Sequence, residues 1–300
     1  MASVLSAKHY HDEDAAFAFV ERHVWPNGPV CPHCGGVERI SKMQGKATRK
    51  GLHKCYQCRK QFTVRQGTIF ESSHVPLHIW LQAIFLVAGS KKGISSNQLH
   101  RTLGVTLKTA WFMSHRIREA MRSGALGPMG GIVEVDETYI GRKEGYAFPR
   151  GGVSHKMAVL SLVNRTGESR SFVVDHANVH NVLPIMQRNI DAEAHLMTDE
   201  HGMYRKIGPS FRTHSVVCHQ FDEYARGEVH TNTVEGYFSI FKRGMRGVYQ
   251  WCAEKHLHRY LAEFDFRYSN REALGCDDEQ RAARLLEGVV GKRLTYKACV

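Results

Sequence analysis

The sequence lacks any apolar run long enough to cross a bilayer. Its longest such stretch, residues 79–89, is interrupted by Gln82 and is much shorter than the roughly 20 residues that a spanning helix needs. Residues 1–8 lack the apolar core of a signal peptide, and no internal repeat or low-complexity tract is present. We therefore expect a protein of the reducing cytoplasm without a membrane partner, in which paired cysteines bind metal rather than form disulfides.

Acidic residues are scarce in the first part of the chain. Residues 1–130 contain 18 Lys and Arg against 7 Asp and Glu, a net charge of +11, whereas residues 131–300 contain 23 against 22, a net of +1. Between Arg39 and Arg65 there are nine basic residues and no acidic one. A basic module joined to a nearly neutral one indicates that the first part binds a polyanion, with nucleic acid as the leading candidate.

Two Cys-x-x-Cys pairs lie within this basic part. Cys31 and Cys34 are followed, after 20 intervening residues, by Cys55 and Cys58. Each pair offers two thiolates to one tetrahedral Zn²⁺, the intervening residues can form a hairpin, and Gly35 permits the positive φ of such a knuckle. A redox pair is the alternative, which two matched pairs in a basic segment disfavour. Four thiolates leave no open position, so the zinc is expected to be structural. The nearby histidines and the other cysteines are not spaced as ligands: His33, His53, Cys218, Cys252, Cys276 and Cys299.

A helical segment follows the cysteine module. Residues 76–87 have apolar side chains at helical spacing. Further on, Ser95 or Ser96 can cap a short helix, Gly104 can end it, and Thr106 can cap a longer helix. Two helices joined by a glycine-containing turn, with hydroxyl and basic residues opening the second, are typical of a DNA-reading helix-turn-helix. A plain helical hairpin between two domains is the alternative.

Strands and helices then alternate in an order that predicts a fold. Three strands are expected at residues 132–140, 156–163 and 171–174, then a helix at 182–190, strands at 195–200 and 216–219, a helix around Glu235, and a helix at 256–266. This is the order of an RNase H-like α/β fold, a mixed sheet flanked by helices. In that fold the centre of the first strand and the end of the fourth are neighbours, and a late helix supplies a third acidic residue.

Three carboxylates occupy those places. Asp136 lies on the first strand, where it shares a face with Glu134 while Glu137 points away; Asp199 ends the fourth strand, and Glu235 lies on the late helix. Carboxylates suit two Mg²⁺ or Mn²⁺ ions about 4 Å apart, the arrangement that cuts phosphodiesters. Each acid alone fits a turn or a solvated surface, and Glu137 or Glu200 could replace its neighbour, so the argument rests on their joint occurrence.

Lys242 lies seven residues after Glu235. Seven residues are nearly two helical turns, so the two side chains share a face about 10 Å apart along the axis. A solvated helix surface would explain this spacing as well. Next to a metal site, however, Lys242 would hold a phosphate of the nucleic acid.

These motifs together resemble those of bacterial insertion-sequence transposases that carry a zinc ribbon before a DDE catalytic domain. The resemblance covers roughly residues 10–270. Its most specific part surrounds Glu235. The segments that carry it are Trp25–Gly28 with Cys31–Cys34, Gly67–Ser73, Glu134–Gly141, Thr198–Asp199, and His230–Glu235 with Lys242–Gly244.

The resemblance implies a catalytic set of Asp136, Asp199, Glu235 and Lys242. It implies that a metal-activated water cleaves a strand at the element's end and that the freed 3′-hydroxyl attacks target DNA, without a covalent protein–DNA intermediate. The partners would be double-stranded DNA, as terminal inverted repeats and target, and a second copy of the chain or a larger oligomer, at the bacterial nucleoid. Some relatives use an Asn at the third acidic position, which makes Asn232 a weaker candidate for a role near the metals.

We expect four segments: a zinc ribbon at 1–70, a helix-turn-helix segment at 71–128, an RNase H-like catalytic domain at 129–275 and a C-terminal tail at 276–300. Two alternatives remain for the function: a DNA-binding regulator without catalysis, and an RNase H-like nuclease that cleaves without joining. The basic residues expected to contact DNA are Lys46, Arg49, Lys50, Lys54, Lys108, Arg116, Lys242 and Arg243.

Overall fold

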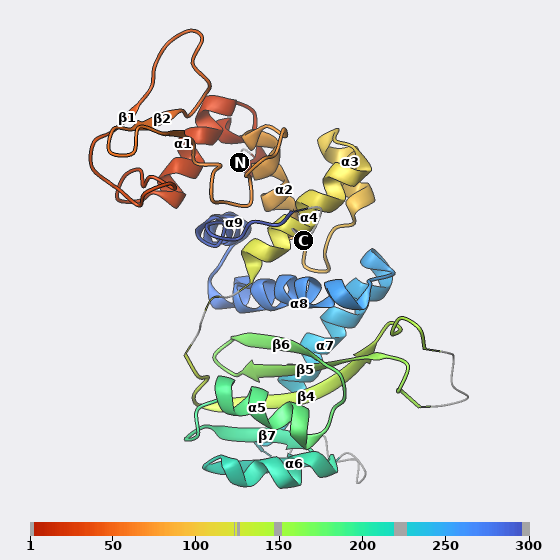
Figure 1. Ribbon diagram of the computed structural model, residues 1–300. Coiled ribbons are helices and arrows are strands. Elements are labelled where there is room, and N and C mark those ends of the chain that lie inside the picture. Colours follow the sequence, from red (N-terminus) through yellow and green to blue (C-terminus); the bar gives the residue numbers. More distant parts are fainter. Residues whose placement is uncertain (1–2, 123, 125–126, 147–151, 219–226, 296–300) are drawn as a thin grey trace. The chain divides into compact units, whose positions relative to one another are not determined.

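The computed structural model describes residues 3–122, 124, 127–146, 152–218 and 227–295. The chain divides into two compact units (Figure 1). The first unit contains Met1–Ser90, Ile94–Arg122 and Cys276–Val300, and the second contains Lys91–Gly93 and Ser123–Gly275. No helix in the described ranges is both long and apolar enough to cross a membrane.

A small antiparallel sheet carries the cysteine motif of the first unit. Its strands are β1 (Ile40–Lys42), β2 (His53–Cys55) and β3 (Gln61–Phe62), in the order β1-β2-β3. The predicted hairpin between the two cysteine pairs is therefore present as β1 and β2. Few apolar side chains support this sheet, with Phe62 buried and Trp25 and Ile40 packed partly against it. Such a core is too small to hold the ribbon together without a further stabilising element.

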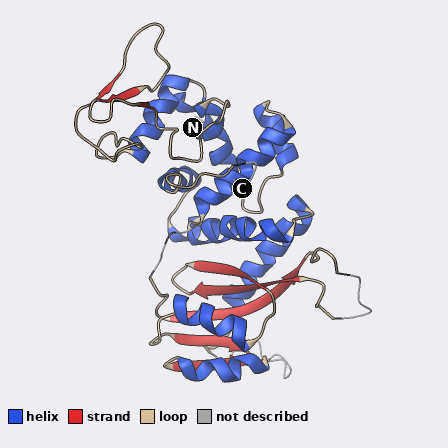
Figure 2. Cartoon of the chain, viewed as in Figure 1, coloured by secondary structure: helices blue, strands red, loops and turns tan. Residues whose placement is uncertain are grey.

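The rest of the first unit is helical (Figure 2). The two caps and the turn predicted for the helix-turn-helix are confirmed. Ser95 Oγ accepts a hydrogen bond from the Gln98 amide at 3.1 Å, Gly104 takes a φ of 66°, and Thr106 Oγ1 accepts from the Thr109 amide at 3.2 Å. The helices are α1 (Glu13–Val24), α2 (Leu77–Gly89), α3 (Ser96–Leu103), α4 (Leu107–Met121) and α9 (Asp278–Glu287), with 3₁₀ turns η1 (Val4–Ser6) and η2 (Lys8–Tyr10).

The C-terminal segment differs from our expectation of a tail. It forms α9, which packs against α1, α2 and α4 of the first unit. A capping box between Asp277 and Gln280 starts this helix, and Leu285 and Leu286 are buried. Apolar residues are few among the charges of this helix, but they share one face, and burial of that face against the distant helices is what stabilises α9.

The second unit is built on a five-stranded mixed sheet in the order β6-β5-β4-β7-β8. β4 pairs antiparallel with β5, and β5 with β6, whereas β7 runs parallel to both β4 and β8. This order confirms the predicted RNase H-like α/β fold. The strands are β4 (Ile132–Ile140), β5 (Met157–Asn164), β6 (Ser169–Val174), β7 (His195–Asp199) and β8 (Thr213–Val217). Our predicted last strand ended at His219, which lies outside the described residues.

Helices cover both faces of this sheet (Figure 1). Alternate residues of β4 face opposite sides, so Val133 and Val135 pack with α5 and α6, whereas Ile140 packs with α7 and α8. Asp136 has the parity of Ile140 and therefore faces α7. The helices are α5 (Val179–Asn189), α6 (Gly202–Ile207), α7 (Asn232–Gly244) and α8 (Glu254–Ser269), with 3₁₀ turns η3 (Gly208–Ser210) and η6 (Glu272–Leu274) and a π-helical turn η5 (Met245–Tyr249) after α7. The sequence reasoning missed α6.

Candidate active site

Asp136 and Asp199 lie on neighbouring parallel strands. The register pairs Ile132 with His195 and Glu134 with Met197. Continuing it by two residues brings Asp136 level with Asp199, on the same face of the sheet. Adjacent strands are about 4.8 Å apart, so the two carboxylates lie close together although 62 residues separate them in the chain.

Glu235 is brought to this face by a buried carboxylate on β4. Glu134 is fully buried, and its two oxygens accept hydrogen bonds from the Thr233 amide at 2.8 Å, the Thr233 hydroxyl at 2.7 Å and the Val234 amide at 3.0 Å. These amides belong to the first turn of α7, which has no partner for them within the helix. Glu134 therefore caps α7 from the strand that the helix covers, and it fixes the turn that carries Glu235.

The same carboxylate also holds the segment before α7. Arg165 Nε donates to Glu134 Oε1 at 2.9 Å, and the Arg165 guanidinium also donates to the carbonyl oxygens of Glu228 and His230 at 2.7 and 3.3 Å. His230 Nδ1 lies 3.3 Å from Glu134 Oε1. The sequence analysis assigned no role to Glu134, Arg165 or His230. The signal was an acidic residue inside an apolar strand, because a buried carboxylate requires partners.

A second anchor holds the middle of α7. The Tyr237 hydroxyl donates to Asp265 of α8 at 2.7 Å, and Asp265 also accepts from the Ser171 amide and hydroxyl of β6, each at 2.8 Å. Burial raises the pKa of Asp265 to about 6, although these hydrogen bonds favour its charged form. The helix that carries Glu235 is thus tied at both its start and its middle to the sheet.

The pKa of Asp136 reflects the acidic residues around it. Its pKa is raised to about 8, first by burial and then by the negative charges of Glu137, Asp199 and Glu235. Its Oδ1 accepts a hydrogen bond from the Glu137 amide at 2.7 Å, which acts in the opposite direction. Like charges raise the pKa of a carboxyl when no cation compensates them.

Glu137 belongs to the opposite face of β4, as the period of two predicted. Its Oε2 accepts from the Tyr204 hydroxyl of α6 at 2.7 Å. Burial, and then the charge of Asp199, raise the pKa of Glu137 in spite of that hydrogen bond. Because Glu137 lies on the face away from α7, Asp136 is the better candidate for the metal site. Glu200 follows the end of β7, and Asn232 is exposed at the first residue of α7.

Lys242 and Arg243 lie in the last turn of α7. Lys242 is half-buried, and its Nζ lies 5.8 Å from the centre of the Phe238 ring. Two turns separate it from Glu235, about 10 Å along the helix. Arg243 is exposed and donates to the Ser239 carbonyl and hydroxyl one turn earlier, at 3.1 and 2.8 Å.

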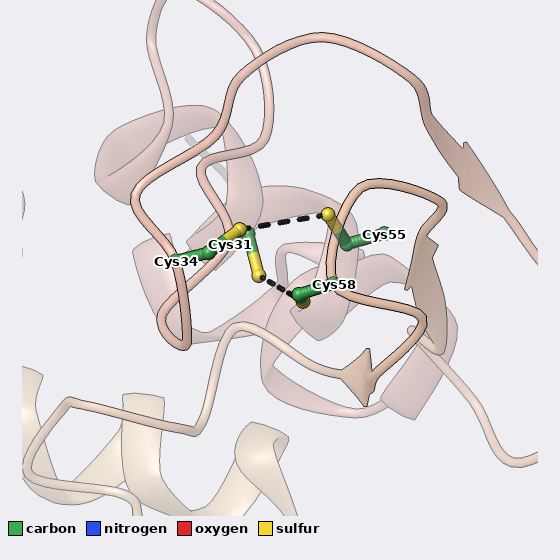
Figure 3. A group of neighbouring side chains, drawn as sticks. All are labelled: Cys31, Cys34, Cys55 and Cys58. Atoms are coloured by element: carbon green, nitrogen blue, oxygen red, sulfur yellow. Dashed lines mark hydrogen bonds between the residues drawn. The ribbon is translucent and has the colours of Figure 1, made fainter.

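The four cysteines of the ribbon converge from two loops (Figure 3). Their sulfur atoms all lie within 4.8 Å of one another, with Cys31 3.6 Å from Cys58 and Cys34 3.8 Å from Cys55. A tetrahedron with Zn–S bonds of about 2.3 Å requires sulfur separations of about 3.8 Å. The donor set and its spacing therefore fit a structural Zn²⁺.

The two knuckles have the same backbone geometry. The Cys31 amide donates to the Gly36 carbonyl at 2.9 Å, and the Cys55 amide donates to the Lys60 carbonyl at 3.0 Å. The residue after each pair takes a positive φ, 72° at Gly35 and 63° at Arg59. Gly35 behaves as predicted, whereas Arg59 adopts the same conformation at the cost that a side chain imposes there.

Two family models match this chain. One, described as an ISXO2-like transposase domain, matches residues 128–269, and the other, described as a transposase zinc-ribbon domain, matches residues 11–61. The chain belongs to the insertion-sequence DDE transposases with an N-terminal zinc ribbon. It is therefore a DNA transposase, and the predicted family and function are confirmed.

Individual proteins also resemble this transposase. An uncharacterized protein in the transposable element ISH50 of Halobacterium salinarum is 27% identical over 274 residues, which cover 83% of this chain and 90% of that protein. Among solved structures, the crystal structure of the Mos1 strand transfer complex matches at 14% identity with a TM-score of 0.23, covering 63% of this chain and 75% of that one.

Most of the basic residues predicted to contact DNA are available on the surface of the transposase. Lys46, Arg49, Lys50 and Lys108 are exposed, and Lys54 is half-buried with its Nζ 5.2 Å from the centre of the Tyr56 ring. Lys50 also forms an ion pair of 2.8 Å with Asp14, an exposed pair that contributes little to stability. Lys46 and Arg49 lie in the loop between β1 and β2, and Lys108 lies in the first turn of α4.

The prediction for Arg116 is wrong. Its side chain is only 5% exposed, and its guanidinium donates to the carbonyl oxygens of Ile69 and Glu71, each at 2.7 Å, and of Leu294 at 3.2 Å. Helical spacing alone placed Arg116 on the reading helix, but that face of α4 packs inside the first unit. Arg116 holds the chain after the ribbon against α4 and does not reach DNA.

Removing zinc is expected to unfold the ribbon and leave the second unit folded. Structural Zn²⁺ contributes on the order of 10 kcal/mol to the folding of small modules, more than the ribbon's own core can replace. We expect Cys58→Ser to lose bound zinc, measured by metal analysis, and to become sensitive to proteolysis between residues 25 and 65. Cys218→Ser, outside the cluster, should keep its bound zinc and its resistance to proteolysis. Full protection of the ribbon in the zinc-free Cys58→Ser protein would contradict the structural role.

Proposed function

We propose that Asp136, Asp199 and Glu235 bind two Mg²⁺ or Mn²⁺ ions and that this site cleaves DNA strands at the element's ends and joins them to target DNA. The observation that carries the proposal is the position of Asp136 beside Asp199 on parallel strands, facing the helix that bears Glu235. Burial, and then the charges of Glu137, Asp199 and Glu235, raise the pKa of Asp136, and a bound divalent cation would favour its charged form.

The residues fit such ions. Carboxylate oxygens are the ligands that Mg²⁺ prefers, and Asp136, Asp199 and Glu235 each supply them. When bound, the ions would activate the attacking oxygen and stabilise the charge on the leaving oxygen.

The protein's own side chains would position the DNA for this reaction. Glu134 keeps Glu235 on the metal-binding face through the first turn of α7. Lys242 lies two turns along the same helix and would hold a phosphate through its positive charge, without transferring a proton. Lys46, Arg49 and Lys108 are exposed cations that would bind DNA phosphates in the first unit.

The substrate follows from the family. The relative described as a protein of a transposable element supports the proposal that the ends of such an element are the DNA that this chain cuts. Joining two ends to one target requires two active sites, so we propose at least a dimer on DNA. The place of action would be the bacterial nucleoid.

The test is a plasmid assay with the purified full chain. We expect Mg²⁺-dependent nicking at the boundary of the element, followed by transfer of the freed 3′ end to a second plasmid, with both products absent when Mg²⁺ is omitted. Sequencing of the products locates the cut. Specific binding without any cleavage would favour the regulator, and cleavage without joining would favour the nuclease.

A further inference from the structure

Trp251 is the most exposed of the large apolar side chains in the described ranges, with 76% of its surface accessible. It follows the π-helical turn Met245–Tyr249 at the end of α7. A single exposed apolar residue is ordinary on a protein surface. Trp251 differs in what surrounds it, because its neighbours in the chain are held in place and it borders a cavity.

The backbone around Trp251 is fixed on both sides. Before it, the Tyr249 ring packs edge-on against Tyr260 at 4.8 Å and Phe264 at 6.3 Å, and the Tyr249 hydroxyl donates to Glu263 of α8. After it, Cys252 is buried. Between them Gln250 takes a φ of 61°, a conformation that is costly for a residue with a side chain. The turn thus presents the indole to solvent from a rigid base.

A cavity of about 260 Å³ lies beside this indole. It is lined by Trp251, by the end of β4 and the start of β5, and by the turn after α7, including Ile140, Met157 and Met245. Two cations, Lys156 and Arg246, belong to the lining, and no acidic residue does. An aromatic face bordered by cations is the combination that binds a nucleotide with its base unpaired, since the base stacks while its phosphate pairs with the charge.

The cavity lies along the strand that carries Asp136. Ile140 is four residues farther on β4, about 13 Å at the rise of a strand, and its side chain faces the same side of the sheet. α7 spans the same interval, with Glu235 in its first turn and Arg246 just past its end. DNA whose phosphate lies at the acids would reach the cavity within about four nucleotides at 3.4 Å per step.

We propose that Trp251, Lys156 and Arg246 form a binding site for an unpaired DNA base a few nucleotides from the strand break. This inference rests on the proposed function, because it assumes that DNA occupies the acidic site. The base stacks on the indole face, and the cations hold the adjoining phosphates. No bond is made or broken at this site.

The test compares two labelled DNA probes with the full zinc-loaded chain, without Mg²⁺, by fluorescence anisotropy. One probe is a 20-base-pair duplex with a four-thymidine 3′ overhang, and the other is the blunt duplex. We expect Trp251→Ala to weaken binding of the overhang probe about tenfold and to change binding of the blunt probe less than twofold. Trp251→Phe should retain most of the preference, and Arg246→Ala should reduce the salt dependence of binding.

Leu274→Ala is the matched control, since Leu274 is an exposed apolar residue of the same unit. Equal affinity of wild type and Trp251→Ala for the overhang probe, or an equal loss on both probes, would overturn the proposal. A change of oligomeric state in Trp251→Ala, measured by light scattering, would assign the indole to a protein interface instead. Because the assay needs no cleavage, its result is independent of whether the acids carry out the proposed reaction.

Discussion

Asp136→Asn is expected to abolish cleavage while making the metal-free protein more stable above neutral pH. Losing one of the proposed metal ligands would remove several kcal/mol of transition-state stabilisation, so we expect the nicking rate to fall by about 1,000-fold or more. Asn keeps an oxygen that can accept the hydrogen bond from the Glu137 amide, so the strand itself should be undisturbed. The two effects have opposite signs, which separates a catalytic role from damage to the fold.

The pH dependence follows from the raised pKa of Asp136. A carboxyl whose pKa rises from 3.8 to about 8 on folding takes up a proton when the chain folds, so its contribution lowers the unfolding free energy as pH increases through that interval. An asparagine side chain does not titrate, so the variant lacks this pH-dependent loss of unfolding free energy. We expect Asp136→Asn to match wild type near pH 4 and to exceed it at pH 8.5 by up to several kcal/mol, since a pKa difference of one corresponds to about 1.4 kcal/mol, measured by urea denaturation without Mg²⁺.

Mg²⁺ should reverse this order, because it stabilises the wild type by binding its folded state and has little effect on the variant. Glu137→Gln provides the matched control: it removes a neighbouring negative charge from the opposite face of β4, so cleavage should persist. If Glu137→Gln lost cleavage while Asp136→Asn retained it, Glu137 would take the place that we assign to Asp136.

Glu134→Ala is expected to have the largest effect on stability. The change leaves the Thr233 and Val234 amides and the Arg165 guanidinium without their buried acceptor. Breaking a buried ion pair in this way costs about 3–5 kcal/mol, measured as a shift of the urea midpoint at constant slope. Because the first turn of α7 loses its anchor, we also expect the Mg²⁺ concentration for half-maximal nicking to rise.

Glu13→Ala is the control for Glu134→Ala. In the first unit Glu13 caps α2 in the same manner, accepting from the Leu77 and His78 amides at 2.9 and 3.1 Å. Its removal should also lower stability, but it should leave the Mg²⁺ dependence of nicking unchanged at temperatures where the protein stays folded. An unchanged Mg²⁺ requirement in Glu134→Ala would show that Glu134 contributes to stability alone.

The three acids could be proposed as a site from the sequence because they follow local patterns. Asp136 stands in a strand with a period of two, Asp199 ends an apolar run, and Glu235 lies in a helix that begins after a turn. The order of these elements restricts the sheet to few topologies, and one of them places the three acids together. The zinc ligands were predictable from their spacing, and the caps of α3 and α4 from their hydroxyl and glycine residues.

The residues that support the site were not predictable in this way. Glu134 meets its amide partners 99 and 100 positions later in the chain, and no local period records such a contact. Arg116 has the helical spacing of a surface residue but lies inside the first unit, because its accepting carbonyls come from segments far from α4. Trp251 has a large apolar side chain, which would be expected in the core, yet the turn before it directs the indole outward.

The sequence by itself determined the four cysteines of the ribbon and the order of the strands, and it predicted the three acids, because each depends on residue type and short-range spacing. Only the tertiary structure decided which charges are buried and paired, which helix end each carboxylate caps, and which aromatic side chain remains exposed. Those outcomes depend on desolvation and on hydrogen bonds between segments that the chain brings together only when it folds.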